Sequence, residues 1–155
     1  VAGWIGSGGA TECQILWATG KATHGEFRGL HNPPQVRIFD FLDPMADAYA
    51  VADLAVSRAG MMTVAELSAW GIPSVLIPLP TAAADHQTPN ARVMAEAGGA
   101  IHLPQGELGP ARLGEIVTGL FQSPDRLLQM AQAAARRGRP EAAQRIVDRI
   151  GILSG

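Results

Sequence analysis

The sequence predicts an α/β fold in which helices cover both faces of a parallel sheet. Short apolar runs of strand length alternate with stretches of helical period along most of the chain. These runs are apolar on both faces, which is typical of strands that a parallel sheet buries on both sides. With 155 residues, 47% of them hydrophobic, the chain is long enough for one domain with a substantial core.

Composition excludes several classes of protein. A net charge of −2 provides no basic field for nucleic acid, so we expect no nucleic-acid partner. No apolar run approaches the length that crosses a bilayer, and the start at Val1 lacks the pattern of a secretion signal. The single cysteine, Cys13, cannot form an internal disulfide, which agrees with a cytoplasmic location.

The elements follow one another in a regular order. Residues 1–11 have no clean period and are interpreted as a helix remnant or a flexible lead-in. We predict a buried strand over residues 13–18, an alternating strand over 36–41, and further short strands over 52–56, 74–78 and 100–103. Between them we predict helices over residues 23–28, 45–50, 63–71 and 86–97, and from Pro110 onward the chain is predicted to be helical in three pieces.

The turn over residues 57–60 joins the third strand to its helix. Thr63 is placed to cap that helix, and Glu66 three residues later completes the spacing of a capping box. A helix start also carries free backbone N–H groups and a partial positive charge, so it can bind a phosphate without a lysine. From these residues alone two interpretations stay open, a plain helix cap and an anion site.

In an open parallel sheet the ligand lies beyond the carboxyl ends of the strands. The segments 41–43, 57–60 and 78–87 follow three of these ends and carry most of the polar side chains there. Within the last segment, His86 could act as a general acid or base, but a surface histidine beside an Asp85 helix cap is the more common explanation of the pattern. The remaining histidines are scattered without carboxylates or cysteines at ligand spacing, and we predict no metal site.

Four ordered blocks of sequence carry a resemblance to a known family. They read FLDPM at 41–45, SRAGMMTVAE at 57–66, GIPS at 71–74, and DHQTPNA at 85–91 followed by EAG at 96–98. Together they resemble the MurG family, transferases that add N-acetylglucosamine from UDP-N-acetylglucosamine to lipid I and so make the peptidoglycan precursor lipid II. The resemblance begins near Leu16 and implies the Rossmann-like, C-terminal, donor-binding half of a two-domain GT-B enzyme of glycosyltransferase family 28.

The resemblance assigns the nucleoside to two segments. The backbone at Leu42 would hydrogen-bond the uracil edge, with Phe41 and Met45 beside the base. Glu66 would accept hydrogen bonds from the ribose hydroxyls, which suits a carboxylate because it offers only acceptors.

The resemblance assigns the diphosphate and the sugar to the helix starts. Thr63 and the amides of Met61 and Met62 would hold the diphosphate, and His86 and Gln87 would meet the sugar hydroxyls. The family pattern also places in the site Arg58, Gly60 and Asn90, the last as a brace for the loop.

The chemistry implied is inverting transfer, in which the acceptor's muramic acid C4 hydroxyl attacks C1 of the donor sugar and UDP leaves. No cofactor and no metal ion are expected. The catalytic base is unknown here, since the family's proposed base lies in the N-terminal half. The parent protein would bind a lipid-linked acceptor through that half and lie peripherally on the cytoplasmic face of the inner membrane.

The sequence departs from the family pattern in two places. The family's C-terminal half begins with a strand and a GGSxGA-type phosphate loop, which are not present at Val1, so we expect residues 1–155 to be this domain truncated at its N-terminal edge and inactive alone. Ala59 also replaces the usual serine of an RSG-type turn. Two alternatives stay open: another GT-B transferase with a different nucleotide sugar or glycolipid acceptor, and a non-catalytic sugar-nucleotide-binding subunit that needs a partner chain.

Overall fold

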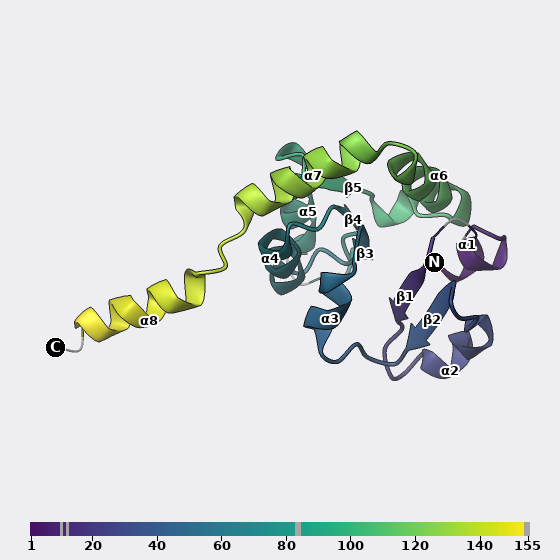
Figure 1. Ribbon diagram of the computed structural model, residues 1–155, viewed down its shortest axis with the longest axis horizontal. Helices are drawn as coiled ribbons and strands as arrows, with labels where there is room; N and C mark the ends of the chain where they lie inside the picture. Colours follow the sequence, from purple (N-terminus) through teal and green to yellow (C-terminus); the bar gives the residue numbers. More distant parts are fainter. Residues whose placement is uncertain (10, 12, 83–84, 154–155) are drawn as a thin grey trace. The chain divides into compact units, whose positions relative to one another are not determined.

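The computed structural model describes residues 1–9, 11, 13–82 and 85–153 (Figure 1). The chain divides into two compact units. The first unit comprises Val1–Ala52 and Gly106–Pro124, and the second comprises Asp53–Gln105 and Asp125–Gly155. Among the described residues, no helix combines the length and the apolar character that a membrane crossing requires.

The first unit contains a two-stranded parallel sheet, in which β1 (Ile15–Ala18) pairs with β2 (Val36–Phe39). Val36 and Ile38 of β2 are buried, and partly buried apolar side chains from β1 and the helices pack against them. The helical elements of this unit are α1 (Ala2–Gly6), α2 (His24–Phe27), η1 (Arg28–Leu30), α3 (Met45–Ala50) and α6 (Pro110–Phe121). The short 3₁₀ turn η3 (Gln105–Glu107) leads from the second unit into this one.

The start of the chain folds as a short helix and not as a flexible lead-in. Trp4 on α1 is only 7% exposed. A Cβ added at Gly114 of α6 would lie 3.0 Å from the Trp4 indole, so α6 approaches α1 closely at a residue without a side chain. The helix-remnant interpretation of this segment is therefore the correct one for Ala2–Gly6.

The prediction that β1 is buried is wrong. Its residues alternate between half-buried and exposed, and Leu16 is 40% exposed. In the described part of the chain β1 pairs only with β2. The apolar run therefore correctly predicts a strand, but it does not predict how much of that strand its own unit covers.

The second unit contains a three-stranded parallel sheet in the order β3 (Ala55–Ser57), β4 (Ser74–Leu76), β5 (Ala100–His102). The central strand β4 is buried along its whole length, with Val75 and Leu76 fully inaccessible. Continuous burial of this kind explains why β4 has no polar alternation in the sequence. The helices of this unit are α4 (Met61–Trp70), α5 (Gln87–Glu96), α7 (Pro124–Arg137) and α8 (Ala142–Leu153).

Helix α4 ends where its sequence predicts. Gly71 adopts a left-handed conformation with φ of 67°; its N–H donates to the Ser68 carbonyl at 3.1 Å, and the Ile72 N–H donates to the Leu67 carbonyl at 2.9 Å. A glycine in this conformation is the common way to stop a helix. The following Ile72 is 2% exposed and leads directly into β4.

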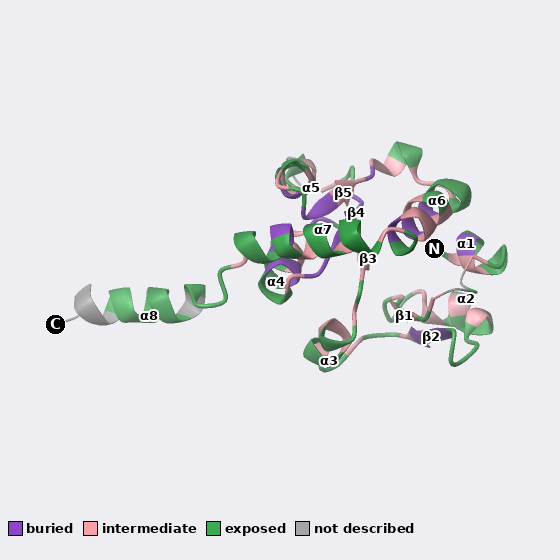
Figure 2. Ribbon diagram, turned by 45° about the horizontal axis from the view of Figure 1, so that its top comes forward, coloured by how far each residue is buried: buried purple, intermediate pink, exposed green. Residues whose placement is uncertain are grey.

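The three C-terminal helices occur as predicted, but their apolar stripes are not equally buried. Helix α6 buries Leu113, Val117 and Leu120, whereas Ile146 and Val147 of α8 are 60% and 62% exposed. Figure 2 shows this contrast, with α8 exposed at its described side chains. The predicted class, parallel β-structure flanked by helices, is confirmed in both units.

Candidate functional site

The candidate site lies at one edge of the second unit's sheet. Because β3, β4 and β5 are parallel, their carboxyl ends meet at the same edge. The loops that leave this edge begin at Arg58, Ile77 and Leu103, and the first two lead to the starts of α4 and α5. The sequence-predicted residues from 58 to 66 and from 86 to 90 therefore belong to one unit.

Helix α4 begins two residues earlier than predicted. Gly60 is its N-cap, with extended φ and ψ of −63° and 145°, and no side chain caps the helix. The Val64 N–H donates to the Gly60 carbonyl at 2.9 Å, which is the first bond of the helix. The amides of Met61, Met62 and Thr63 precede that bond and have no acceptor within the helix.

The predicted capping box is consequently wrong. A capping Thr63 would have to stand outside the helix, but it is the third helical residue, and Glu66 is in the second turn. Gly60 supplies the extended N-cap backbone without a side chain, so Thr63 is not needed as a cap. Glu66 is exposed on α4, one turn beyond the leading amides.

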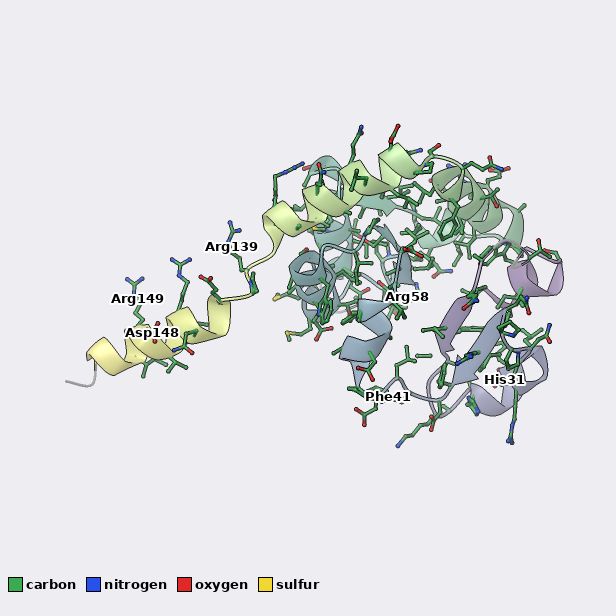
Figure 3. The ribbon with its side chains drawn as sticks, viewed as in Figure 1. His31, Phe41, Arg58, Arg139, Asp148 and Arg149 are labelled. Carbon is green, nitrogen blue, oxygen red and sulfur yellow. The ribbon has the colours of Figure 1, made fainter. Side chains whose placement is uncertain are left out.

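Arg58 connects the ends of all three strands of the second unit. Its Nη1 donates to the carbonyls of Ile77 and Pro78, at 3.3 and 3.4 Å, and to Gln105 Oε1 at 2.6 Å. Figure 3 labels Arg58 where the chain leaves β3. In this structure the Nη1 group of Arg58 is thus committed to the protein's own acceptors.

The loop between β4 and α5 is fixed by Gln87. Its Oε1 accepts a hydrogen bond from the Leu79 amide at 3.0 Å, so the Nε2 amino group is the part of the side chain that remains to donate elsewhere. The neighbouring His86 is exposed and is the N-cap of α5. An Asp85 N-cap is therefore not found; Asp85 has φ of 50°, and its Oδ1 accepts the Thr88 hydroxyl at 2.7 Å.

Asn90 links the start of α5 to the loop before α4. Its Nδ2 donates to the Ala59 carbonyl at 3.0 Å. Ala59 is completely buried, so water has no access to that residue. The two loops that lead to the helix starts are therefore joined in both directions, by Arg58 to Ile77 and Pro78 and by Asn90 to Ala59.

The three residues predicted to surround the base belong to the first unit. Phe41, Leu42 and Met45 lie where β2 continues into α3. Phe41 is 61% exposed and is labelled on this segment in Figure 3, while Leu42 and Met45 are half-buried. The Phe41 amide donates to Asp40 Oδ1 at 2.8 Å, which fixes the backbone just before Leu42.

One residue at this edge was missed by the sequence analysis. Gln105 follows β5, and its contact with Arg58 spans 47 residues of sequence, so no local pattern reveals it. The rule that sites gather at carboxyl ends of parallel strands points to it, because β5 ends only three residues earlier. No group of three or more histidine, cysteine or acidic residues in the described part of the chain could hold a metal ion.

The chain was compared with known proteins. A family model described as the glycosyltransferase family 28 C-terminal domain matches residues 6–146. The chain is 41% identical over 136 residues to the UDP-N-acetylglucosamine–N-acetylmuramyl-(pentapeptide) pyrophosphoryl-undecaprenol N-acetylglucosamine transferase of Salinibacter ruber, covering 87% of this chain and 36% of that protein. The protein of the same name from Desulfitobacterium hafniense is 40% identical over 146 residues, covering 90% of this chain and 40% of the relative.

Solved structures of glycosyltransferases are also similar to this chain. The crystal structure of Acinetobacter baumannii MurG is similar with a TM-score of 0.78 and 34% identity, over 89% of this chain and 41% of that chain. A calicheamicin glycosyltransferase shares the fold with a TM-score of 0.64 at 23% identity, over 92% of this chain and 37% of that chain. The chain thus spans about two fifths of the length of the relatives it matches.

Proposed function

The chain belongs to the glycosyltransferase family 28 C-terminal domain, and on that basis we propose that it is the donor-binding part of a MurG-type UDP-N-acetylglucosamine transferase. The parent protein would transfer N-acetylglucosamine to the lipid-linked acceptor lipid I and form lipid II for peptidoglycan. This chain would supply the binding site for UDP-N-acetylglucosamine and release UDP.

The start of α4 is the observation that carries the proposal. Three amides, of Met61, Met62 and Thr63, precede the first helical bond at the carboxyl edge of a parallel sheet. Such a helix start attracts a diphosphate through its free donors and its partial positive charge. Glu66 is exposed one turn further along the same helix, where a ribose attached to that diphosphate could donate its hydroxyls to the carboxylate.

The same arrangement accounts for the leaving group. As the acceptor hydroxyl attacks C1 of the sugar with inversion, negative charge grows on the UDP diphosphate. The amides at the start of α4 are already oriented by the helix, so they stabilise this charge without reorganisation. No cofactor and no metal ion have a role in this proposal.

The sugar would lie towards the start of α5. Gln87 keeps its Oε1 on the Leu79 amide and would donate from Nε2 to a sugar hydroxyl, while His86 is exposed at the same helix start. Phe41, Leu42 and Met45 would surround the uracil, with the Leu42 backbone on its edge. We further propose a peripheral location of the parent protein on the cytoplasmic face of the inner membrane, and no nucleic-acid partner.

Calorimetric titration of the chain with UDP-N-acetylglucosamine tests the proposal. Wild-type protein is expected to bind, and Glu66→Ala is expected to weaken binding by about 10- to 100-fold, the equivalent of losing a charged hydrogen-bond acceptor worth roughly 1.5–3 kcal/mol. The matched control is Glu96→Ala, which removes an exposed carboxylate from the far end of α5, about 14 Å of helix from its start.

Competition experiments test which nucleotide sugar the chain binds. UDP should displace the donor, whereas a dTDP-sugar should not compete at similar concentrations. A folded protein that binds no UDP-N-acetylglucosamine, or that binds it equally well with Glu66→Ala, would contradict the proposal. Preference for a dTDP-sugar would favour another GT-B transferase.

A further inference from the structure

The guanidinium of Arg58 is hydrogen-bonded to groups of the protein itself. Its three recorded acceptors are the carbonyls of Ile77 and Pro78 and the side chain of Gln105. The bond to Gln105, at 2.6 Å, is the shortest of the three. Nη1 carries two N–H groups, so one serves the short bond to Gln105 and the two carbonyls share the other. Together these contacts orient the guanidinium, and the charge on the donor strengthens the short bond most.

The backbone that Arg58 contacts continues directly into the segment with the proposed sugar contacts. Ile77 and Pro78 precede Leu79, whose amide donates to Gln87 Oε1 at 3.0 Å. Arg58 therefore holds the carbonyl side of this turn, and Gln87 holds the next amide. Ile77 is also held by its own amide, which donates to the Ser57 carbonyl at 2.9 Å. Loss of the Arg58 bonds would therefore free Pro78 and Leu79 to move and would remove the fixed partner of Gln87.

A second hydrogen bond runs from α5 back to the loop before α4. Asn90 of α5 donates to the carbonyl of Ala59, which adjoins Arg58 and immediately precedes the Gly60 N-cap of α4. The start of α4 and the start of α5 are thus linked by two sets of bonds: Arg58, before α4, donates to the backbone of the loop that leads to α5, and Asn90 of α5 donates to the backbone just before α4.

We propose that Arg58 and Gln105 form a positioning pair that holds residues 77–79, and through the Leu79 amide the sugar-contacting Gln87, in register with the start of α4. This inference rests on the proposed function and deepens it. Arg58 acts on the loop backbone and does not touch the diphosphate, and Gln105 anchors Arg58 from the end of β5. The pair therefore determines how the sugar is bound, while the nucleotide is bound by other groups.

The binding of two ligands distinguishes positioning from direct phosphate contact. Arg58→Ala and Gln105→Ala are expected to weaken binding of UDP-N-acetylglucosamine about tenfold and to change binding of UDP, which lacks the sugar, less than about twofold. An arginine that touched the diphosphate would weaken both ligands to the same extent. Equal losses for UDP and UDP-N-acetylglucosamine would therefore overturn the proposal.

Gln105→Glu is the sharpest variant because the two models predict opposite results. It keeps an acceptor for Arg58 and adds a charge, so a positioning pair should keep wild-type affinity for the sugar nucleotide. If Arg58 bound phosphate, the new carboxylate would compete for it and weaken UDP binding.

A measurement without ligand separates this inference from the proposed function. Amide hydrogen exchange of the ligand-free protein should show the Leu79 amide exchanging at least about fivefold faster in Arg58→Ala than in wild type, since its turn is released. Unchanged exchange at Leu79 would overturn the positioning role. Suppose that the wild type bound neither ligand, but that Arg58→Ala still accelerated exchange of the Leu79 amide. The proposal that the chain binds the donor would then fail, whereas the positioning of Leu79 by Arg58 would be supported.

Discussion

The hydrogen bond from Asn90 to Ala59 allows a quantitative prediction. Asn90→Ala removes the Nδ2 donor 3.0 Å from the Ala59 carbonyl, and Ala59 is 0% exposed. A buried acceptor left without a partner costs about 1–3 kcal/mol. Alanine is a better helix former than asparagine by about 0.5 kcal/mol, which offsets part of this cost because Asn90 lies within α5. The net loss of unfolding free energy should be about 0.5–2.5 kcal/mol.

Urea denaturation monitored by circular dichroism measures this loss directly. Asn90→Asp provides the matched variant, since it is nearly isosteric but sets an acceptor against the Ala59 carbonyl, and it should destabilise the protein more than Asn90→Ala does. Arg92→Ala, at an exposed position on the same helix, should change the free energy by less than about 0.5 kcal/mol. If Asn90→Ala were as stable as Arg92→Ala, or if Asn90→Asp were the milder change, the linkage of the two loops would be refuted.

Two further predictions concern the helices. Gly71→Ala should lower the melting temperature, because φ of 67° costs a residue with a side chain about 1–2 kcal/mol and the new Cβ would lie 3.3 Å from the Ala135 Cβ; an unchanged melting curve would contradict the left-handed helix end. Ile146→Ser on α8 should change the unfolding free energy by less than about 0.5 kcal/mol, since Ile146 is 60% exposed, and a loss above about 2 kcal/mol by urea denaturation would show that this face is covered.

Local patterns were sufficient to predict the order of the elements. Helix α6 begins at Pro110 and carries an apolar stripe of which Leu113, Val117 and Leu120 are buried. The apolar residues Val75 and Leu76 of β4 are likewise fully buried. In both cases the residues that define the pattern are also the residues that pack. The spacing of the apolar residues predicts the element because the same residues form its buried face.

Prediction failed where backbone conformation or distant neighbours decide. The capping-box spacing of Thr63 and Glu66 is a valid signal, but Gly60 is an equally good N-cap and comes first in the chain, so the helix begins at Met61. The exposure of Leu16 depends on which elements pack on its face of the sheet, which its own residues do not determine.

The candidate site also contains features that the sequence predicts and a contact that only the fold reveals. The rule on carboxyl ends of parallel strands selects the loops that begin at Arg58 and Ile77 without any family information. The contact between Arg58 and Gln105 joins residues 47 positions apart, and only the fold brings them together. The resemblance supplies ligand roles for these residues, and those roles remain predictions.

The most direct test of the account follows a titration with UDP-N-acetylglucosamine at individual amides of the ¹⁵N-labelled chain. The account predicts that the largest chemical-shift changes occur at Met61, Met62 and Thr63, whose N–H groups would receive the diphosphate, while the amides of α8 keep their positions. UDP should reproduce the shifts at α4. Binding that left these three amides unmoved, or shifts that centred on another helix start, would contradict the claim that α4 binds the donor diphosphate.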